Sequence, residues 1–250
     1  MMKALSLEYY KIRRRKVWAM LTLFLAAELG WASMSMGISI SRSAANATWE
    51  ALIFSLSSMN GLFLPILSAI VVSRICDMEH KGDTWKMLLT TSVGRSSIYA
   101  AKYICAGSLM LYGILAQAVF IVGFGVLHKL DGPLPVALLL QFAAGTLSAN
   151  LLITAMQQWI SLAVKNQAFA LCLGMLGAFL GTTASLFPAA VRHVIVWSYY
   201  LDLSPVTYVY KASSGTYITG TMPLVQLSVA LVLTLLLYAA GNTHISRQEI

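Results

Sequence analysis

The residue types that carry out enzymatic chemistry are few and scattered in this sequence. Its four histidines, His80, His128, His193 and His244, lie in segments that we read as loops, where solvated or interfacial side chains are more common than metal ligands. The sequence contains neither H-E-x-x-H nor G-x-S-x-G. It also lacks G-x-x-x-x-G-K-[ST], the loop that holds ATP phosphates. We therefore expect neither an enzyme nor a metal or cofactor site in this chain.

One carboxylate needs a physical explanation, because Glu28 lies in the middle of an apolar segment. An ionised carboxylate at the centre of a membrane helix costs about 2.5–3.5 kcal/mol on an insertion scale. Glu28 should therefore face a wet cavity, where it could contact a cationic substrate, or form a hydrogen bond between helices. Trp31 and Ser35 lie near the same helical face, which makes Glu28 and Trp31 candidates for a substrate path.

A second unusual feature is an apolar stripe inside a charged segment, residues 74–100. At helical spacing, Trp85, Leu88, Leu89 and Ser92 share one face. An apolar stripe of this kind is expected to be buried against a protein or a membrane rather than exposed to water. Docking into a groove of a partner protein and lying on the inner leaflet explain it equally well.

The composition places these features in a membrane protein. The chain is 58% hydrophobic and 10% charged, with a mean hydropathy of +0.75, so it does not resemble a soluble domain. About 20 apolar residues span a bilayer. We predict an all-α polytopic membrane protein, with a single membrane domain over residues 1–250. Its six spans are placed at 17–40, 51–73, 102–127, 135–163, 168–187 and 223–241.

The basic residues predict the orientation of these spans. With the N-terminus inside, 13 of the 17 Lys and Arg residues fall on the inner side, which the positive-inside rule favours. Both termini are then cytoplasmic, and the net charge of +8 reflects topology rather than nucleic-acid binding. Residues 1–16 are expected to form an amphipathic elbow helix on the inner interface, with Met2, Leu5, Tyr9 and Ile12 on its apolar stripe.

The segment before the last span, residues 188–222, is too apolar for a solvated loop and too interrupted for a span. It contains Trp197, Tyr208 and four other Trp or Tyr residues, with breaks at Pro188, Pro205 and Gly215. We expect short helices at the outer interface. An aromatic belt explains them most simply, and a gate that contacts substrate, with Trp197 and Tyr208 as candidates, is the alternative.

Small and sulfur-containing residues add two further expectations. Cys76, Cys105 and Cys172 are too far apart in the sequence to indicate a disulfide framework or a metal site, so we read them as structural. Gly174 and Gly177, with Gly181, put small residues on one face of the fifth span, where they would permit close packing.

The charged segment resembles the loop between spans two and three of type-2 ABC exporter permeases. The likeness rests on Glu79, Gly82, Thr84, Leu88, Leu89, Ile98, Lys102 and the turn that runs from Ser92 through Val93 and Gly94 to Arg95. The pattern Glu79-His80-Lys81 followed by Thr84-Trp85-Lys86-x-Leu88-Leu89-Thr90 is similar to permease subunits of bacterial lantibiotic self-immunity transporters. Asp83 between Gly82 and Thr84, and Val93-Gly94 in place of a Pro-containing turn, depart from the family pattern.

The resemblance implies a mechanism and partners. A separate cytoplasmic ABC ATPase dimer, which holds ATP and Mg, would act on spans two and three through a coupling helix. Its ATPase-coupling residues would be Glu79, Gly82, Thr84, Trp85, Leu88, Leu89 and Arg95. A second permease chain, identical or paralogous, would complete the path through the bacterial cytoplasmic membrane, and a lantibiotic or similar peptide would be expelled from the lipid.

Three alternatives remain beside a lantibiotic exporter. An exporter permease for a bacitracin-like drug, a lipid or an ion has the same architecture. A channel or secondary transporter predicts charge along several spans, whereas Glu28 is nearly alone. A membrane-embedded enzyme needs a catalytic constellation that the motifs do not supply.

Overall fold

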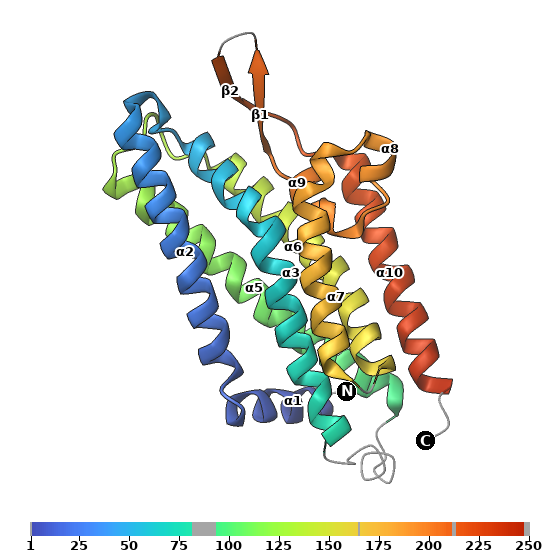
Figure 1. Cartoon of the computed structure of the whole chain (residues 1–250). Helices are drawn as coiled ribbons and strands as arrows, with labels where there is room; N and C mark the ends of the chain where they lie inside the picture. Colours follow the sequence, from blue (N-terminus) through green and yellow to red (C-terminus); the bar gives the residue numbers. More distant parts are fainter. Residues whose placement is uncertain (1, 82–93, 165, 212–213, 248–250) are drawn as a thin grey trace.

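The computed structural model describes residues 2–81, 94–164, 166–211 and 214–247, with the side chains of 78–81, 189, 211 and 214 left out. Six long helices run side by side, and both chain termini lie at the same end of the bundle (Figure 1). We call this the basic end and the opposite one the hairpin end. The long helices are α2 (Val17–Arg42), α3 (Trp49–Lys81), α5 (Arg95–Leu127), α6 (Val136–Ala163), α7 (Gln167–Thr183) and α10 (Leu224–Arg247).

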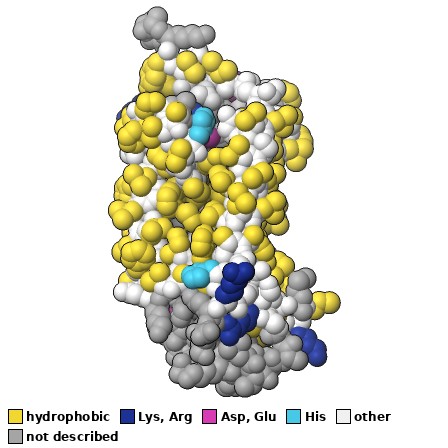
Figure 2. Space-filling view, turned by 90° about the vertical axis from the view of Figure 1, so that its right-hand side faces the viewer, with side chains coloured by type: hydrophobic (Ala, Val, Ile, Leu, Met, Phe, Trp, Pro, Cys, Tyr) yellow, Lys and Arg dark blue, Asp and Glu magenta, His cyan; other side chains and the backbone are white. Residues whose placement is uncertain are grey.

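All six predicted spans are confirmed as helices long and apolar enough to cross a membrane. Apolar side chains cover the middle of the molecule on the face shown in Figure 2, and Lys and Arg gather toward the basic end. The two largest boundary differences are at α3, which runs to Lys81 rather than to residue 73, and at α5, which begins at Arg95 rather than near residue 102. The extra turns of α5 are fastened to the end of α10, because Ser96 Oγ donates to Asn242 Oδ1 at 2.7 Å.

The predicted elbow helix is α1 (Met2–Arg14), which lies across the base of the bundle (Figure 1). Lys16, at φ 53° and ψ 30°, makes the left-handed turn into α2. Of the predicted stripe, Ile12 is buried and Leu5 and Tyr9 pack against the core, whereas Met2 is 85% exposed. The buried face consists of Ala4, Glu8 and Ile12, because α1 turns the Glu8 carboxylate toward a lysine of α5 rather than keeping a purely apolar face inside.

The outer segment differs from the expected run of short helices. It begins with α8 (Ala189–Arg192), η3 (Val196–Ser198) and α9 (Tyr199–Asp202), as predicted, and η2 (Ala184–Leu186) precedes it at the end of the predicted fifth span. It then forms an antiparallel hairpin of β1 (Val206–Lys211) and β2 (Ser214–Thr219), which projects beyond the bundle (Figure 1). Alternating Val, Thr and Tyr favours strand, and this preference prevails over the interfacial helix that we expected. The other outer turns are η1 (Ala44–Asn46) between α2 and α3, and residues 128–135 between α5 and α6.

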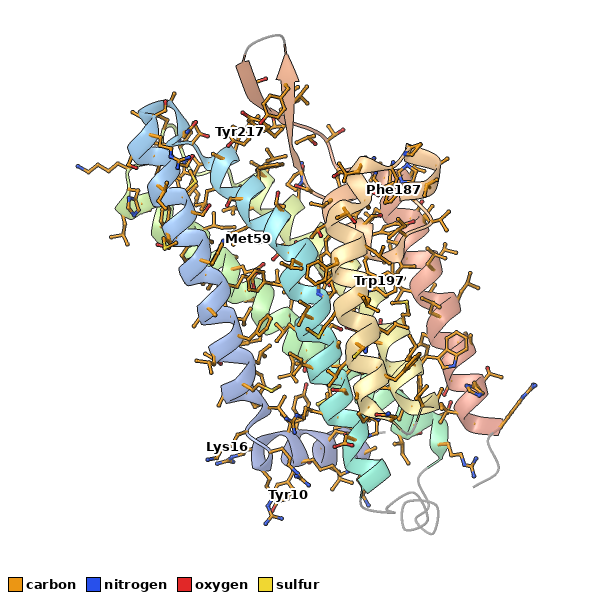
Figure 3. All side chains as sticks on the ribbon, viewed as in Figure 1. Tyr10, Lys16, Met59, Phe187, Trp197 and Tyr217 are labelled. Atoms are coloured by element: carbon orange, nitrogen blue, oxygen red, sulfur yellow. The ribbon has the colours of Figure 1, made fainter. Side chains whose placement is uncertain are left out.

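The glycine stripe of α7 is confirmed as a close-packing surface. A Cβ at Gly174 would overlap Ala69 of α3, and one at Gly177 would overlap the Trp197 indole. At Gly181 it would lie 2.7 Å from the Trp197 carbonyl oxygen. The stripe therefore receives η3 as well as a neighbouring helix (Figure 3).

We predict that Gly181→Ala destabilises the protein by about 1–3 kcal/mol, because the new methyl group meets backbone that cannot rotate away. The matched control is Gly30→Ala in α2, where a Cβ would meet no heavy atom within 4 Å. Thermal unfolding of both purified variants in detergent measures the difference. A midpoint for Gly181→Ala as high as that of the control would contradict the tight fit of η3 on α7.

Candidate functional site

A cluster of three polar side chains lies in the membrane-spanning part of the bundle. Gln117 of α5 donates from Nε2 to Glu28 Oε1 of α2 at 3.1 Å and to Asn60 Oδ1 of α3 at 2.7 Å. Asn60 Nδ2 returns a bond to Gln117 Oε1 at 3.2 Å. All three residues are buried, so three spans that cannot bond through their backbones are joined by amide and carboxyl groups.

This geometry bears on both interpretations of Glu28. The bond from Gln117 supports the inter-helix role, whereas Glu28 Oε2 has no hydrogen-bond partner among the described residues. Trp31, which we placed beside Glu28, is 59% exposed on the surface of the bundle, whereas Glu28 is 0% exposed. The structure therefore does not bring the two candidate path residues of α2 together.

A cavity of about 500 Å³ lies at the hairpin end, where β1 passes over α3, α7 and α9. Its lining combines hydroxyl groups, an aromatic wall and one pair of opposite charges. The residues concerned are Phe54, Ser57, Ser58, Thr182, Ser185, Arg192, Leu201, Asp202, Ser204, Val206, Thr207 and Tyr208.

The two candidate gate residues have different surroundings. Tyr208 lines this cavity and packs on Phe54 and Tyr217, with ring centroids 5.9 and 4.9 Å away. Trp197 is half-buried against Gly177 and Gly181 and is not among the lining residues of this cavity. The structure thus favours a packing role for Trp197 and leaves Tyr208 as the candidate that borders open space.

Asp202 holds the outer segment in place. Its Oδ1 lies 2.8 Å from Arg192 Nε, at an angle too bent for a hydrogen bond, so the contact is a charge pair. Ser198 Oγ donates to Asp202 Oδ2 at 3.2 Å, and His193 Nδ1 lies 3.4 Å from the same oxygen. One carboxylate therefore ties α8, η3 and α9 into a single corner beside the cavity.

The predicted ATPase-coupling residues mostly lie outside the described part of the chain. Residues 82–93, which include Gly82, Thr84, Trp85, Leu88 and Leu89, are not described, nor is the side chain of Glu79. Arg95 is described, and its guanidinium donates to the carbonyl oxygen of Ser246 at 3.4 Å. The start of α5 is thereby fastened to the end of α10.

The sequence reasoning missed a buried ion pair at the basic end. Lys102 of α5 is 0% exposed, and its Nζ lies 3.1 Å from Glu8 Oε2 of α1 and 3.2 Å from the Ile75 carbonyl oxygen of α3. Lys11 approaches the other Glu8 oxygen at 3.1 Å. A usable signal was present, because Glu8 interrupts the apolar stripe of α1 and Lys102 begins the apolar run of α5.

The Glu8–Lys102 ion pair anchors the elbow helix to α5. A hydrogen bond of 2.6 Å from the Tyr9 hydroxyl to Ser108 Oγ joins the same two helices. Through the Ile75 carbonyl, Lys102 also reaches the last turns of α3. Lys102 therefore connects α3 and α5, the helices that precede and follow residues 82–93, to each other and to the elbow helix.

We predict that Glu8 and Lys102 are energetically coupled. Glu8→Gln and Lys102→Met should each lower the unfolding temperature, and the double variant should cost less than their sum by about 0.5–3 kcal/mol. The control cycle is Glu8 with Lys11, whose side chain is 23% exposed, where a coupling of about 0.2–1 kcal/mol is expected. Additive effects in the first cycle would show that the anchor contributes nothing.

A family model described as ABC-2 family transporter protein matches residues 4–181, from the elbow helix to the end of α7. No curated protein matches the sequence.

Proposed function

The chain belongs to the ABC-2 transporter family, and from this membership we propose that it is an exporter permease that expels a lantibiotic or a similar amphipathic antimicrobial peptide from the membrane. That it is a membrane-spanning permease of an ABC transporter follows from the family and from the six apolar helices. The peptide substrate rests on the likeness of residues 79–90 to lantibiotic self-immunity permeases and on the cavity at the hairpin end. A bacitracin-like drug, a lipid and an ion are the alternatives.

The observation that carries the peptide proposal is the mixed chemistry of this cavity. It offers hydroxyl groups from α3, α7 and η2 together with the aromatic ring of Tyr208. A peptide that inserts into a membrane presents the same mixture, because its backbone amides need hydrogen-bond partners while its apolar side chains leave water.

The orientation follows from charge. α1, the start of α5 and the end of α10 share the basic end (Figure 1). The positive-inside rule favours a cytoplasmic position for this end, and in our proposal the hairpin projects outward and both termini are cytoplasmic in a bacterial membrane. The cavity is then at the outer surface, where an expelled peptide must leave.

The family implies an ABC ATPase partner. In our proposal, a dimer of this ATPase holds ATP and Mg, and two permease chains, identical or paralogous, enclose the path. Residues 79–92 would dock on the ATPase through Trp85, Leu88 and Leu89, while Glu79, Gly82, Thr84 and Arg95 would shape the ends of the docking element. The Lys102 anchor would then carry the movement into α3, α5 and the elbow.

The proposed export is tested in proteoliposomes that contain the permease and its ATPase. Addition of ATP should lower the amount of membrane-bound fluorescein-labelled lantibiotic, and a non-hydrolysable ATP analogue should not. If ATP is hydrolysed while the bound peptide stays constant, the peptide proposal fails and a lipid or ion substrate takes its place.

We predict that replacing Leu88 and Leu89 with Asp releases the ATPase, because two carboxylates cannot enter an apolar groove unpaired. Co-purification with the tagged ATPase measures the loss. The control is Lys86→Asp together with Thr90→Asp, which adds the same two groups away from the Trp85 stripe. Equal retention of the ATPase by both double variants would place its contact elsewhere.

We predict that Glu28→Gln folds and assembles normally, because an amide can keep the bond that Gln117 makes with Glu28. Gln117→Leu, which leaves Glu28 and Asn60 without that partner, should lose about 1–3 kcal/mol of stability. Export by the stable Glu28→Gln variant then separates the two roles. Lost export identifies a carboxylate that contacts the cationic peptide, and full export limits Glu28 to helix packing.

A further inference from the structure

The hairpin-end cavity has a neighbour on the other side of Phe54. A second cavity, of about 320 Å³, lies between α2, α3 and β2. Its lining residues are Ser35, Met36, Ser39, Ala51, Phe54, Ser55, Ser58, Met59 and Tyr217. Phe54 and Ser58 line both cavities, so the two spaces meet at the same turn of α3.

Aromatic rings of the hairpin cover this junction. Tyr208 of β1 and Tyr217 of β2 are cross-strand partners, and both pack on Phe54, with centroid distances of 5.9 and 5.7 Å. Gly215 allows this arrangement, because a Cβ there would overlap the Tyr208 hydroxyl. Tyr217 points toward the bundle, above the level of Met59 (Figure 3).

The floor of the larger cavity contains an unused hydrogen-bonding group. Ser57 is 3% exposed, and its Oγ has no hydrogen-bond partner among the described residues. This oxygen is covered by neighbouring atoms, so hydrogen bonds to an occupant come from the exposed hydroxyl groups of the lining, such as that of Ser185. The charges of Arg192 and Asp202 neutralise each other, so the lining gives no strong preference to a free ion of either sign.

We propose that the two cavities form one binding site for an extended segment of an amphipathic peptide, which rests on the proposed function and specifies its outer substrate site. The two cavities lie on either side of the Phe54 ring, so each can hold one of two neighbouring side chains of a peptide. Ser58 and Ser185 supply hydrogen bonds to its amides, and Tyr208 and Tyr217 cover its apolar groups. A peptide fits this divided shape better than one compact headgroup does.

The test uses a single cysteine at the junction. Ser58→Cys in a Cys172→Ala background removes the exposed native thiol, while Cys76 and Cys105 remain buried. The matched control is Ser41→Cys. Ser41 is exposed at the hairpin end of α2 and lines neither cavity. Both are placed in the complete transporter in proteoliposomes and labelled from outside with an impermeant maleimide.

Both cysteines should react, and unlabelled lantibiotic should protect only Ser58→Cys. At a peptide concentration of about ten times its Kd, labelling there should slow about tenfold, because only the unoccupied fraction reacts. Three outcomes would overturn the site: no labelling of Ser58→Cys, equal protection of both cysteines, or a labelling rate that follows lipid composition and ignores peptide.

The outcome is independent of the export assay. If the wild-type transporter expels peptide while Ser58→Cys stays unprotected, export stands and this site is wrong. If Ser58→Cys is protected while ATP leaves the bound peptide unchanged, the site stands and the export proposal fails.

Discussion

The structure depends on one constraint, which is that a bilayer offers polar groups no partners. Helices satisfy their own backbones, but every polar side chain inside the membrane must bond within the protein. Gln117 meets this demand by joining Glu28 to Asn60, and Lys102 meets it by joining Glu8 to a backbone carbonyl. All four bonds join different helices: three connect α5 to the spans α2 and α3, and the fourth connects α5 to the elbow, so the need for partners helps to hold these helices together.

The same constraint separates what the sequence could predict from what it could not. Hydropathy is a property of single segments, and all six spans were found from it. The elbow helix was also predictable, because a basic amphipathic stretch beside the first span is a local pattern. The pairing of Glu8 with Lys102 is not local. Each residue looked like a minor irregularity until the fold brought them to 3.1 Å.

The outer segment shows a second kind of limit. Its aromatic content and its breaks predicted an interfacial structure, and α8, η3 and α9 fit that expectation. The hairpin did not: its alternating Val, Thr and Tyr favour strand, and its rings also pack on Phe54, which lies far away in the sequence. The candidate residues divided for the same reason: Trp197 fills the glycine surface of α7, whereas Tyr208 borders a cavity.

The two polar contacts of α5 have a consequence for the order of synthesis. Glu8 precedes Lys102 by 94 residues, and Glu28 precedes Gln117 by 89. A chain that emerges from the ribosome N-terminus first must therefore make the elbow and the first two spans before either acid can meet its partner. Entry of α5 into the membrane satisfies both acids at once, which makes the third span the step at which a loose set of inserted helices becomes a fixed bundle.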